Sequence, residues 1–203
     1  MKVRDLSVPG AFEFSPTVFP DSRGLFLTPY TEESFVEVLG HPLHVAQTNH
    51  SVSRRGVVRG VHFAAVPPGQ AKYVYCPRGA FLDVVVDLRE GSPTFGQWDV
   101  VHCDETSLRA VYVSEGLGHA MVALTDDTAI SYLCSAGYNP GAEFAINPMD
   151  PELALPWPDD VELVLSERDL AAPSLADTRA AGRLPSYQAC LARYAELRAA
   201  ASR

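Results

Sequence analysis

The sequence has little that would hold the chain in a membrane or cross-link it through disulfides. Its longest clean apolar run, 120–124, is far shorter than the roughly 20 residues that span a bilayer. Lys2 and Arg4 near the start are not followed by a continuous apolar stretch, so no signal peptide is expected. The four cysteines are scattered without a CxxC pair, which predicts free thiols in the core of a soluble, cytoplasmic protein.

Basic residues are also scarce, with 16 Lys and Arg against 25 Asp and Glu and a net charge of -9. Proteins that bind nucleic acid usually present a basic face, so this balance argues against such a partner. The 203 residues, 47% of them hydrophobic and 20% charged, have the composition of a globular protein. We expect one domain over 1–203, with a β-barrel core at about 45–140 and a C-terminal helical segment at about 166–203.

Short runs rich in β-branched and aromatic residues recur about every ten residues from 49 to 138. Turn sequences separate them, and this spacing predicts an all-β sandwich or barrel. The expected strands are 57–63, 72–76, 81–88, 97–103, 108–113, 119–124 and 129–134. In one of them, Asp83 and Asp87 fall on the face opposite the aliphatic residues, so they line either a wet surface or a cavity.

Helices are expected only outside this β-rich region. Thr31 can cap a helix that runs to Leu39 and ends at Gly40. A second helix from Ser186 should pack one face against the barrel. The residues of that face are Tyr187, Leu191, Tyr194 and Leu197. The proline-rich stretch 147–158 is expected to be an ordered loop.

One predicted strand contains Arg59 and His62, which differ in parity and would face opposite sides of a regular strand. A bend at Gly60 could bring both side chains to one cavity. Arg54 and Arg55 lie close by in an otherwise acidic chain. Guanidinium groups match phosphate oxygens, so the three arginines are a candidate phosphate clamp; alternatively, two are solvated on a loop and one is salt-bridged.

His62 has three possible roles: a hydrogen-bonded core imidazole, a metal ligand or an acid–base group. Metal-binding cupin barrels need a second histidine two residues further along this strand, where the sequence has Ala64. Phe63 and Ala65 cannot ligate a metal either, so the usual metal triad cannot form. The pattern therefore favours acid–base chemistry without a metal or cofactor.

Several ordered blocks resemble the dTDP-4-dehydrorhamnose 3,5-epimerase family over about residues 12–185. Besides 59–72 they are DSRG (21–24), QTNHSVS (47–53), DVVVDLREGSPTFGQW (83–98), EGLGHA (115–120), YLCSAGY (132–138), DPELALPWP (150–158) and LSERD (165–169). The resemblance implies a cupin or jelly-roll barrel that works as a metal-free dimer. It is nearest to the epimerases of antibiotic deoxysugar pathways, which act on dTDP-4-keto-6-deoxyhexoses.

The resemblance also implies four catalytic residues. His62 would be the base that removes a proton beside the ketone, with Asp169 holding its other nitrogen. Lys72 would stabilise the enolate oxygen, and Tyr132 would return a proton from the opposite face of the ring. Taken singly, Lys72 could be a solvated turn residue, Tyr132 a core residue and Asp169 an exposed acid at a helix end.

The substrate-binding residues implied by the resemblance are Arg23, Phe26, Gln47, Asn49, Ser51, Arg59, His119, Tyr138, Glu143 and Arg168. Among them, Arg59 and Arg23 would contact the diphosphate, Arg23 from the partner subunit. Phe26 and Tyr138 would contact the flat thymine ring. Arg168 stands where many relatives have lysine, which keeps the charge but changes the hydrogen-bonding geometry.

Three departures from the family pattern bear on specificity. The chain has Ala120 and Met121 in place of Gly-Phe, Pro29 in place of glutamate, and 63–65 (FAA) in place of a Phe-Gln pair. They predict a roomier and less polar sugar pocket. The expected activity is inversion of C5, C3 or both, with a 5-epimerase or a 3,5-epimerase of weak second activity favoured.

Three other functions remain open: a dTDP-4-keto-sugar 3,4-ketoisomerase, a metal-dependent cupin enzyme and a non-catalytic sugar-nucleotide-binding barrel. An exposed sheet edge would favour a homodimer, since open edges tend to be paired or covered. The family resemblance implies that residues from about 12 to 30 are exchanged between the subunits.

Overall fold

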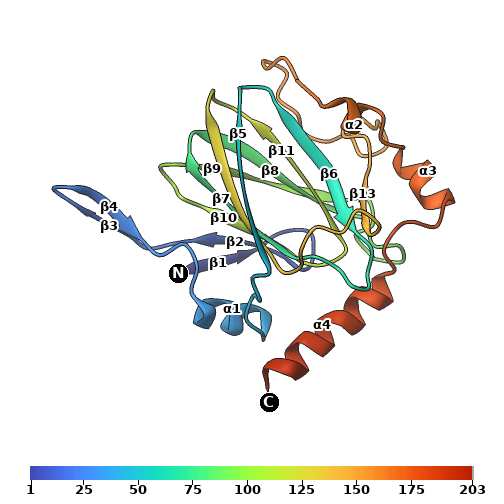
Figure 1. Cartoon of the computed structure of the whole chain (residues 1–203), viewed down its shortest axis with the longest axis horizontal. Coiled ribbons are helices and arrows are strands. Elements are labelled where there is room, and N and C mark those ends of the chain that lie inside the picture. Colours follow the sequence, from blue (N-terminus) through green and yellow to red (C-terminus); the bar gives the residue numbers. More distant parts are fainter. Residues whose placement is uncertain (203) are drawn as a thin grey trace.

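Alternating apolar residues build two antiparallel sheets that face each other across a common core (Figure 1). The computed structural model describes residues 1–202. One sheet has the strand order β1-β2-β10-β7-β12-β5, the other has β13-β6-β11-β8-β9, and β3 and β4 form a separate hairpin. The strands are β1 (Lys2–Asp5), β2 (Ala11–Ser15), β3 (Val18–Asp21), β4 (Gly24–Leu27), β5 (Gln47–Ser53), β6 (Val58–Ala64), β7 (Lys72–Arg78), β8 (Ala80–Asp87), β9 (Trp98–Asp104), β10 (Ala110–Val113), β11 (Leu117–Ala123), β12 (Thr128–Cys134) and β13 (Glu143–Ala145). The helices are α1 (Glu32–Leu39), α2 (Glu167–Leu170), α3 (Leu175–Ala180) and α4 (Tyr187–Ala201).

Each sheet buries both of its faces, and β8 illustrates how the sequence achieves this. Phe81 and Val85 point between the sheets into the inner core, whereas Val84 and Val86 belong to a second cluster on the outer face. Asp83 shares the parity of the inner residues, so its carboxylate is directed into the barrel. The predicted division of this strand into two faces and the all-β jelly-roll class are therefore confirmed.

All seven predicted strands are present, with ends that differ by a few residues. The sequence did not point to β5, because Val52 is its only large aliphatic residue and apolar alternation is missing. β5 becomes a strand through pairing with β12 along its whole length, from Gln47 opposite Cys134 to Ser53 opposite Thr128. It lies at the edge of the six-stranded sheet.

Both predicted helices form, and the packed face of the second is mostly the expected one. α1 follows Thr31 and ends at Gly40, whose left-handed φ of 78° suits glycine. α4 begins after Ser186, whose hydroxyl accepts a hydrogen bond from the Ala189 N–H. Of its four predicted face residues, Tyr187, Tyr194 and Leu197 are partly buried. Leu191 is 38% exposed, and Cys190 beside it is buried instead.

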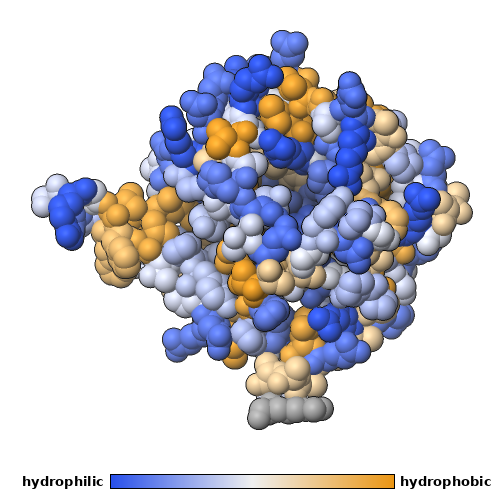
Figure 2. Space-filling view, viewed as in Figure 1, coloured by the Kyte–Doolittle hydropathy of each residue, from blue (hydrophilic) through white to orange (hydrophobic). Residues whose placement is uncertain are grey.

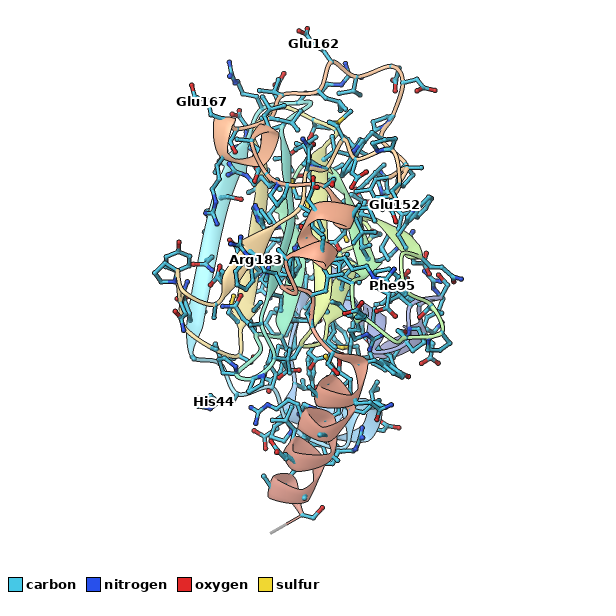
Figure 3. All side chains as sticks on the ribbon, turned by 90° about the vertical axis from the view of Figure 1, so that its right-hand side faces the viewer. His44, Phe95, Glu152, Glu162, Glu167 and Arg183 are labelled. Carbon is cyan, nitrogen blue, oxygen red and sulfur yellow. The ribbon has the colours of Figure 1, made fainter. Side chains whose placement is uncertain are left out.

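The segment after β13 covers the outer face of the five-stranded sheet. Leu153, Leu155 and Leu175 are buried there, and the indole N–H of Trp98 donates to the carbonyl of Leu153 at 3.0 Å. The proline-rich stretch 147–158 is the ordered loop that was expected. In Figure 3 this C-terminal segment runs along the strands from the end near Glu162 to α4. Its path brings α2 against β6 at one end of the barrel.

The four cysteines are buried and free, as predicted. Within residues 1–202, no helix combines the length and the apolar character needed to cross a membrane.

Candidate active site

Two adjoining cavities open at the barrel end beside α2. The larger, of about 470 Å³, is lined by strands of both sheets and by 164–166 and 168–169. The smaller, of about 360 Å³, extends it toward Gln47 and Tyr138. Both cavities are lined by His62, Lys72, Tyr132 and Arg168, so these side chains stand where the two join. The four predicted catalytic residues, including Asp169, all line the larger cavity.

A bulge at Gly60 brings Arg59 and His62 to the same cavity. His62 pairs with His119 and Arg59 pairs with Met121, so three steps along β6 correspond to two along β11. Gly60 has a φ of +118°, and a Cβ there would come within 2.5 Å of the His119 carbonyl oxygen. Only glycine fits this close approach. The bend that the sequence suggested is confirmed.

His62 and Asp169 form a hydrogen-bonded pair although 107 residues separate them. His62 Nε2 lies 2.8 Å from Asp169 Oδ1, and Asp169 is 4% exposed. Ser166, the N-cap of α2, donates to Asp169 Oδ2 at 2.9 Å. Burial would raise the pKa of Asp169, but the hydrogen bond and charge of His62, the Ser166 hydroxyl and Arg168 together lower it. An ionised Asp169 accepts the Nε2 proton, which leaves His62 Nδ1 free to act as a base.

Lys72 and Tyr132 supply an amino group and a phenol to the same cavity. Burial lowers the pKa of Lys72, and the Glu143 and Asp83 carboxylates oppose this shift. Burial raises the pKa of Tyr132, so its phenol keeps its proton at neutral pH. An imidazole, an amino group and a phenol in one cavity are groups that can move a proton on and off a carbon beside a carbonyl.

The smaller cavity has a polar, hydrogen-bonded wall. Gln47 Nε2 donates to Asn49 Oδ1 at 2.8 Å, and Gln47 Oε1 accepts from the backbone N–H of Tyr138 at 2.8 Å. The Tyr138 ring is 57% exposed and available for stacking on a flat base. Glu143 also lines this cavity, and Ser51 lines the larger one. All of these positions were predicted as substrate-binding.

Asp83 contacts a residue of the site, although the sequence did not predict a role for it. Its Oδ2 lies 2.8 Å from Nε2 of His119, which lines the larger cavity. The signal was already present in the alternation of β8, which left open whether the Asp83 face was wet or lined a cavity. Within residues 1–202, no group of three or more His, Cys, Asp or Glu side chains is arranged to hold a metal ion.

The predicted clamp of three arginines does not form. Arg55 pairs with Asp160 at 3.4 Å on the surface, and its N–H donates to Asp126 at 3.0 Å. Arg54 is exposed on the turn before β6 and lines neither cavity. Arg59 alone reaches the larger cavity, where its Nε donates to Ser53 Oγ at 3.1 Å. Arg54 and Arg55 lie exposed at the turn before β6, as the alternative expected for two of the three, whereas Arg59 lies within β6.

The residues behind the expected roomier sugar pocket lie in different surroundings, and the size of the pocket stays a prediction. Met121 lines the larger cavity. Ala120 packs into the cluster on the outer face of the sheet, whereas Ala64 is 8% exposed at the end of the strand that carries His62. The carbonyl of Pro29 accepts a hydrogen bond from the Tyr73 hydroxyl at 2.6 Å, and Pro29 lines neither cavity.

Arg23 and Phe26 lie on the β3–β4 hairpin and line neither cavity of their own chain. The hairpin extends away from the barrel as an arm (Figure 1). Arg23 pairs with Asp21 at 2.6 Å, and Phe26 is 66% exposed. Figure 2 shows hydrophobic side chains gathered along this arm between its polar tip and the body.

Comparison with known sequences gives a consistent family. A model of the dTDP-4-dehydrorhamnose 3,5-epimerase family matches residues 5–177. A dTDP-4-dehydrorhamnose 3,5-epimerase of Mycolicibacterium smegmatis is 55% identical, over 95% of this chain and 94% of the relative. A dTDP-4-dehydrorhamnose 3-epimerase of Streptomyces niveus is 52% identical, over 95% of this chain and 92% of the relative.

Solved structures agree. The rmlC epimerase of Mycobacterium tuberculosis superposes with a TM-score of 0.95 at 52% identity, covering 97% of this chain and 100% of that one. ChmJ, a 3'-monoepimerase from Streptomyces bikiniensis in complex with dTDP-quinovose, gives a TM-score of 0.93 at 49% identity. The match covers 95% of this chain and 98% of that one. NovW, a 4-keto-6-deoxy sugar epimerase from the novobiocin biosynthetic gene cluster of Streptomyces spheroides, gives a TM-score of 0.91 at 52% identity. The match covers 94% of this chain and 95% of that one.

Proposed function

Since the chain belongs to the dTDP-4-dehydrorhamnose 3,5-epimerase family, we propose that it epimerises a dTDP-4-keto-6-deoxyhexose beside the ketone. It is an isomerase of deoxysugar biosynthesis. The observation that carries the mechanism is the meeting of His62, Lys72, Tyr132 and Asp169 in one cavity. The likeness to ChmJ and NovW supports a place in the antibiotic branch of the family.

The first step is proton abstraction by His62. The ketone at C4 acidifies the C–H bonds at C3 and C5, and Nδ1 of His62 takes the proton from one of these carbons. The C–H electron pair becomes a carbon–carbon double bond, and the carbonyl pair moves onto oxygen as an enolate. Asp169 stabilises the imidazolium that forms, and the Lys72 ammonium stabilises the enolate oxygen.

The second step returns a proton to the other face of the carbon. The enolate re-forms the ketone as its carbon takes the phenolic proton of Tyr132, and the sugar centre is inverted. The phenolate then regains a proton while the His62 imidazolium loses one, directly or through solvent. Tyr132 suits this role because its raised pKa keeps the hydroxyl protonated until the enolate has formed.

The nucleotide would occupy the polar side of the site. Arg59 and Arg168 can form charge-assisted hydrogen bonds with the diphosphate, and Gln47, Asn49 and Ser51 offer neutral ones. Tyr138 would stack on the thymine from the rim of the smaller cavity. Binding energy gained here would hold the sugar between base and acid.

We propose that both C3 and C5 are inverted. Relatives at 55%, 54% and 52% identity are named 3,5-epimerases, whereas others at 52% and 51% are named 3-epimerases. Inversion at C3 is common to these names, and C5 inversion accompanies it in the first group. The expectation of a C5-only enzyme draws no support from them.

The test is hydrogen exchange in heavy water. The wild type should incorporate deuterium at C3 and C5 of a dTDP-4-keto-6-deoxyhexose, read by NMR, and should yield inverted product. His62→Ala should abolish incorporation, while Tyr132→Phe should allow exchange without net inversion. Tyr75→Phe, a matched loss of one hydroxyl outside both cavities, should behave as wild type. Exchange by His62→Ala at the wild-type rate would refute the assigned base, and a carbonyl moved to C3 would indicate a ketoisomerase.

We also propose a homodimer in which the β3–β4 arm of one subunit completes the site of the other. Three apolar residues of the arm, Phe19, Leu25 and Phe26, are 57%, 53% and 66% exposed, more than a free monomer would favour. β5, which carries Gln47 and Asn49 of the site, is a sheet edge that can accept another strand. Docking there would bring Arg23 and Phe26 beside the partner's cavity.

Mixing two inactive variants tests this arrangement. Arg23→Ala and His62→Ala subunits should each have low activity alone. In a heterodimer, the Arg23→Ala subunit keeps His62, and the His62→Ala subunit supplies Arg23 to that same site. One of the two sites would therefore be complete and active. No recovery after mixing and subunit exchange, or a monomer by analytical ultracentrifugation, would contradict the proposal.

A further inference from the structure

Asp83 is a fully buried carboxylate with only part of its hydrogen-bonding capacity used. It is 0% exposed on the inner face of β8, and its Oδ2 lies 2.8 Å from His119 Nε2. Its Oδ1 is buried and has no hydrogen-bond partner within residues 1–202. A buried carboxylate with one partner is costly unless a positive charge lies nearby.

Charged and titratable groups from several strands surround Asp83 and Lys72. His119 comes from β11, and Cys103 from β9. Lys72 lies on β7 of the opposite sheet, and it lines the cavity together with His62, Tyr132 and Arg168. His119 also lines this cavity, so Asp83 is placed to act on a group that faces the sugar.

We propose that Asp83 is a positioning residue of the active site, which fixes the tautomer of His119. This inference rests on the proposed function. A carboxylate can only accept, so His119 Nε2 must carry the proton and donate it to Asp83. His119 Nδ1 is then an acceptor for a sugar hydroxyl in the cavity that His119 lines.

The site therefore contains two histidine–carboxylate pairs of different character. His62 and His119 are directly opposite each other on β6 and β11, and each places Nε2 against a carboxylate. Asp169 receives a second hydrogen bond, from Ser166. Asp83 Oδ1 has no hydrogen-bond partner within residues 1–202, so the contact with His119 is what this carboxylate makes there. An apolar residue would pack better beside Phe81 and Val85, which makes a purely structural role a poor explanation.

The tautomer can be measured on the wild-type protein. Long-range ¹H–¹⁵N spectra of labelled protein distinguish a protonated from an unprotonated ring nitrogen, and the His119 signals are assigned by their loss in His119→Gln. We expect Nε2 protonated and Nδ1 unprotonated at neutral pH. A proton on His119 Nδ1 would mean that Asp83 is the donor or that both ring nitrogens are protonated, and would overturn the inference.

The second measurement is the kinetics of Asp83→Asn, which keeps the shape and removes the charge. An amide can donate to His119 Nε2 as well as accept from it, so the tautomer is no longer fixed. We expect kcat to fall roughly 10- to 100-fold with a smaller change in KM, as for other partners that orient a histidine. An unchanged kcat, or a fall in kcat with the His119 tautomer unchanged, would contradict the positioning role.

His102 provides a matched control. Its Nδ1 pairs with Asp104 at 3.0 Å, but the side chain is 48% exposed on β9 and away from both cavities. His102→Gln should leave the kinetics and the His119 spectrum unchanged. If Asp83→Asn does not fold, the wild-type tautomer alone decides. A wild type without exchange activity would refute the proposed function, while the His119 spectrum would still report on the Asp83 contact.

Discussion

Two buried carboxylates four residues apart on β8 are used in opposite ways. Asp87 accepts hydrogen bonds from Arg89 Nε at 2.8 Å and Nη2 at 2.7 Å, and from the hydroxyls of Ser92 and Thr94 at 2.6 Å each. Arg89 also donates to the carbonyl of Pro9. Asp83 is equally buried, and within residues 1–202 its Oδ2 contacts His119 while its Oδ1 has no partner. Hydrogen bonds within the chain thus occupy both oxygens of Asp87, whereas those of Asp83 occupy one.

The difference separates structure from function within one strand. A saturated ion pair has no capacity left for a ligand, so the Asp87–Arg89 pair can only connect β8, the N-terminal segment and, through Tyr194, α4. The polar groups of the cavity retain free donors and acceptors, which a substrate can satisfy. Substitutions at the Asp87–Arg89 pair should therefore change the free energy of unfolding, and substitutions in the cavity should change the reaction rate or KM.

The largest effect is expected at the catalytic pair. Asp169→Asn removes the charge that stabilises the His62 imidazolium, and the amide can favour the wrong tautomer. We expect the rate of deuterium incorporation to fall about 10²- to 10⁴-fold, with little change in the melting temperature. Ser166→Ala, which removes one hydrogen bond to the same carboxylate, should have a much smaller effect on rate. Equal losses in the two variants would contradict the assigned role.

The next largest effect is on stability. Arg89→Met leaves Asp87 buried without its cation, which should lower the free energy of unfolding by about 3–5 kcal/mol. Urea denaturation followed by circular dichroism would measure the loss. The activity per folded molecule should remain near that of the wild type. A large fall in the activity of the folded fraction would show that the two regions are not separable in this way.

The same pair should make stability sensitive to acid. Burial would raise the pKa of Asp87, but the hydrogen bonds from Arg89, Ser92 and Thr94 and the Arg89 charge lower it overall. A folded-state pKa below the unfolded value of about 3.9 gives stability that is present above that pH and lost as the pH falls further. The difference in unfolding free energy between wild type and Asp87→Asn should therefore shrink below about pH 4. A constant difference in urea titrations from pH 7 to pH 3 would disagree.

The smallest effect is expected on nucleotide binding. Arg59→Gln removes one charge-assisted contact at the cavity. A hydrogen bond to a charged group contributes about 1.5–3 kcal/mol, so KM should rise by about 10- to 100-fold. Arg55→Gln, four positions away, removes an exposed arginine that pairs with Asp160. It should change KM less than about twofold and stability by less than about 1 kcal/mol. A comparable rise in KM for Arg55→Gln would support the predicted phosphate clamp of three arginines.

The core strands could be predicted because their inward positions are apolar and their ends carry turn residues. β5 and the β3–β4 hairpin could not, since β5 is formed by pairing with β12 and the arm projects from the body. Among the arginines, spacing could not decide between Arg59 and Arg55, because the turn before β6 sends them to different surroundings.

The catalytic residues were predicted from family motifs rather than from spacing. No local pattern relates His62 to Asp169, because their contact depends on the path of the C-terminal segment over the outer face of the sheet. Asp83 shows the opposite case. Its face was predictable from alternation, but its contact with His119 depends on which strand lies beside β8.

By itself the sequence determined the all-β class, the two faces of the central strands and the chemical groups available, since alternation and residue type are local properties. Only the tertiary structure decided which of those groups share a cavity. Strand order, the bulge at Gly60 and the return of α2 to the barrel end place His62, Asp169, Lys72 and Tyr132 together. These are contacts between distant segments, and such contacts follow from packing the whole chain rather than from any one stretch of it.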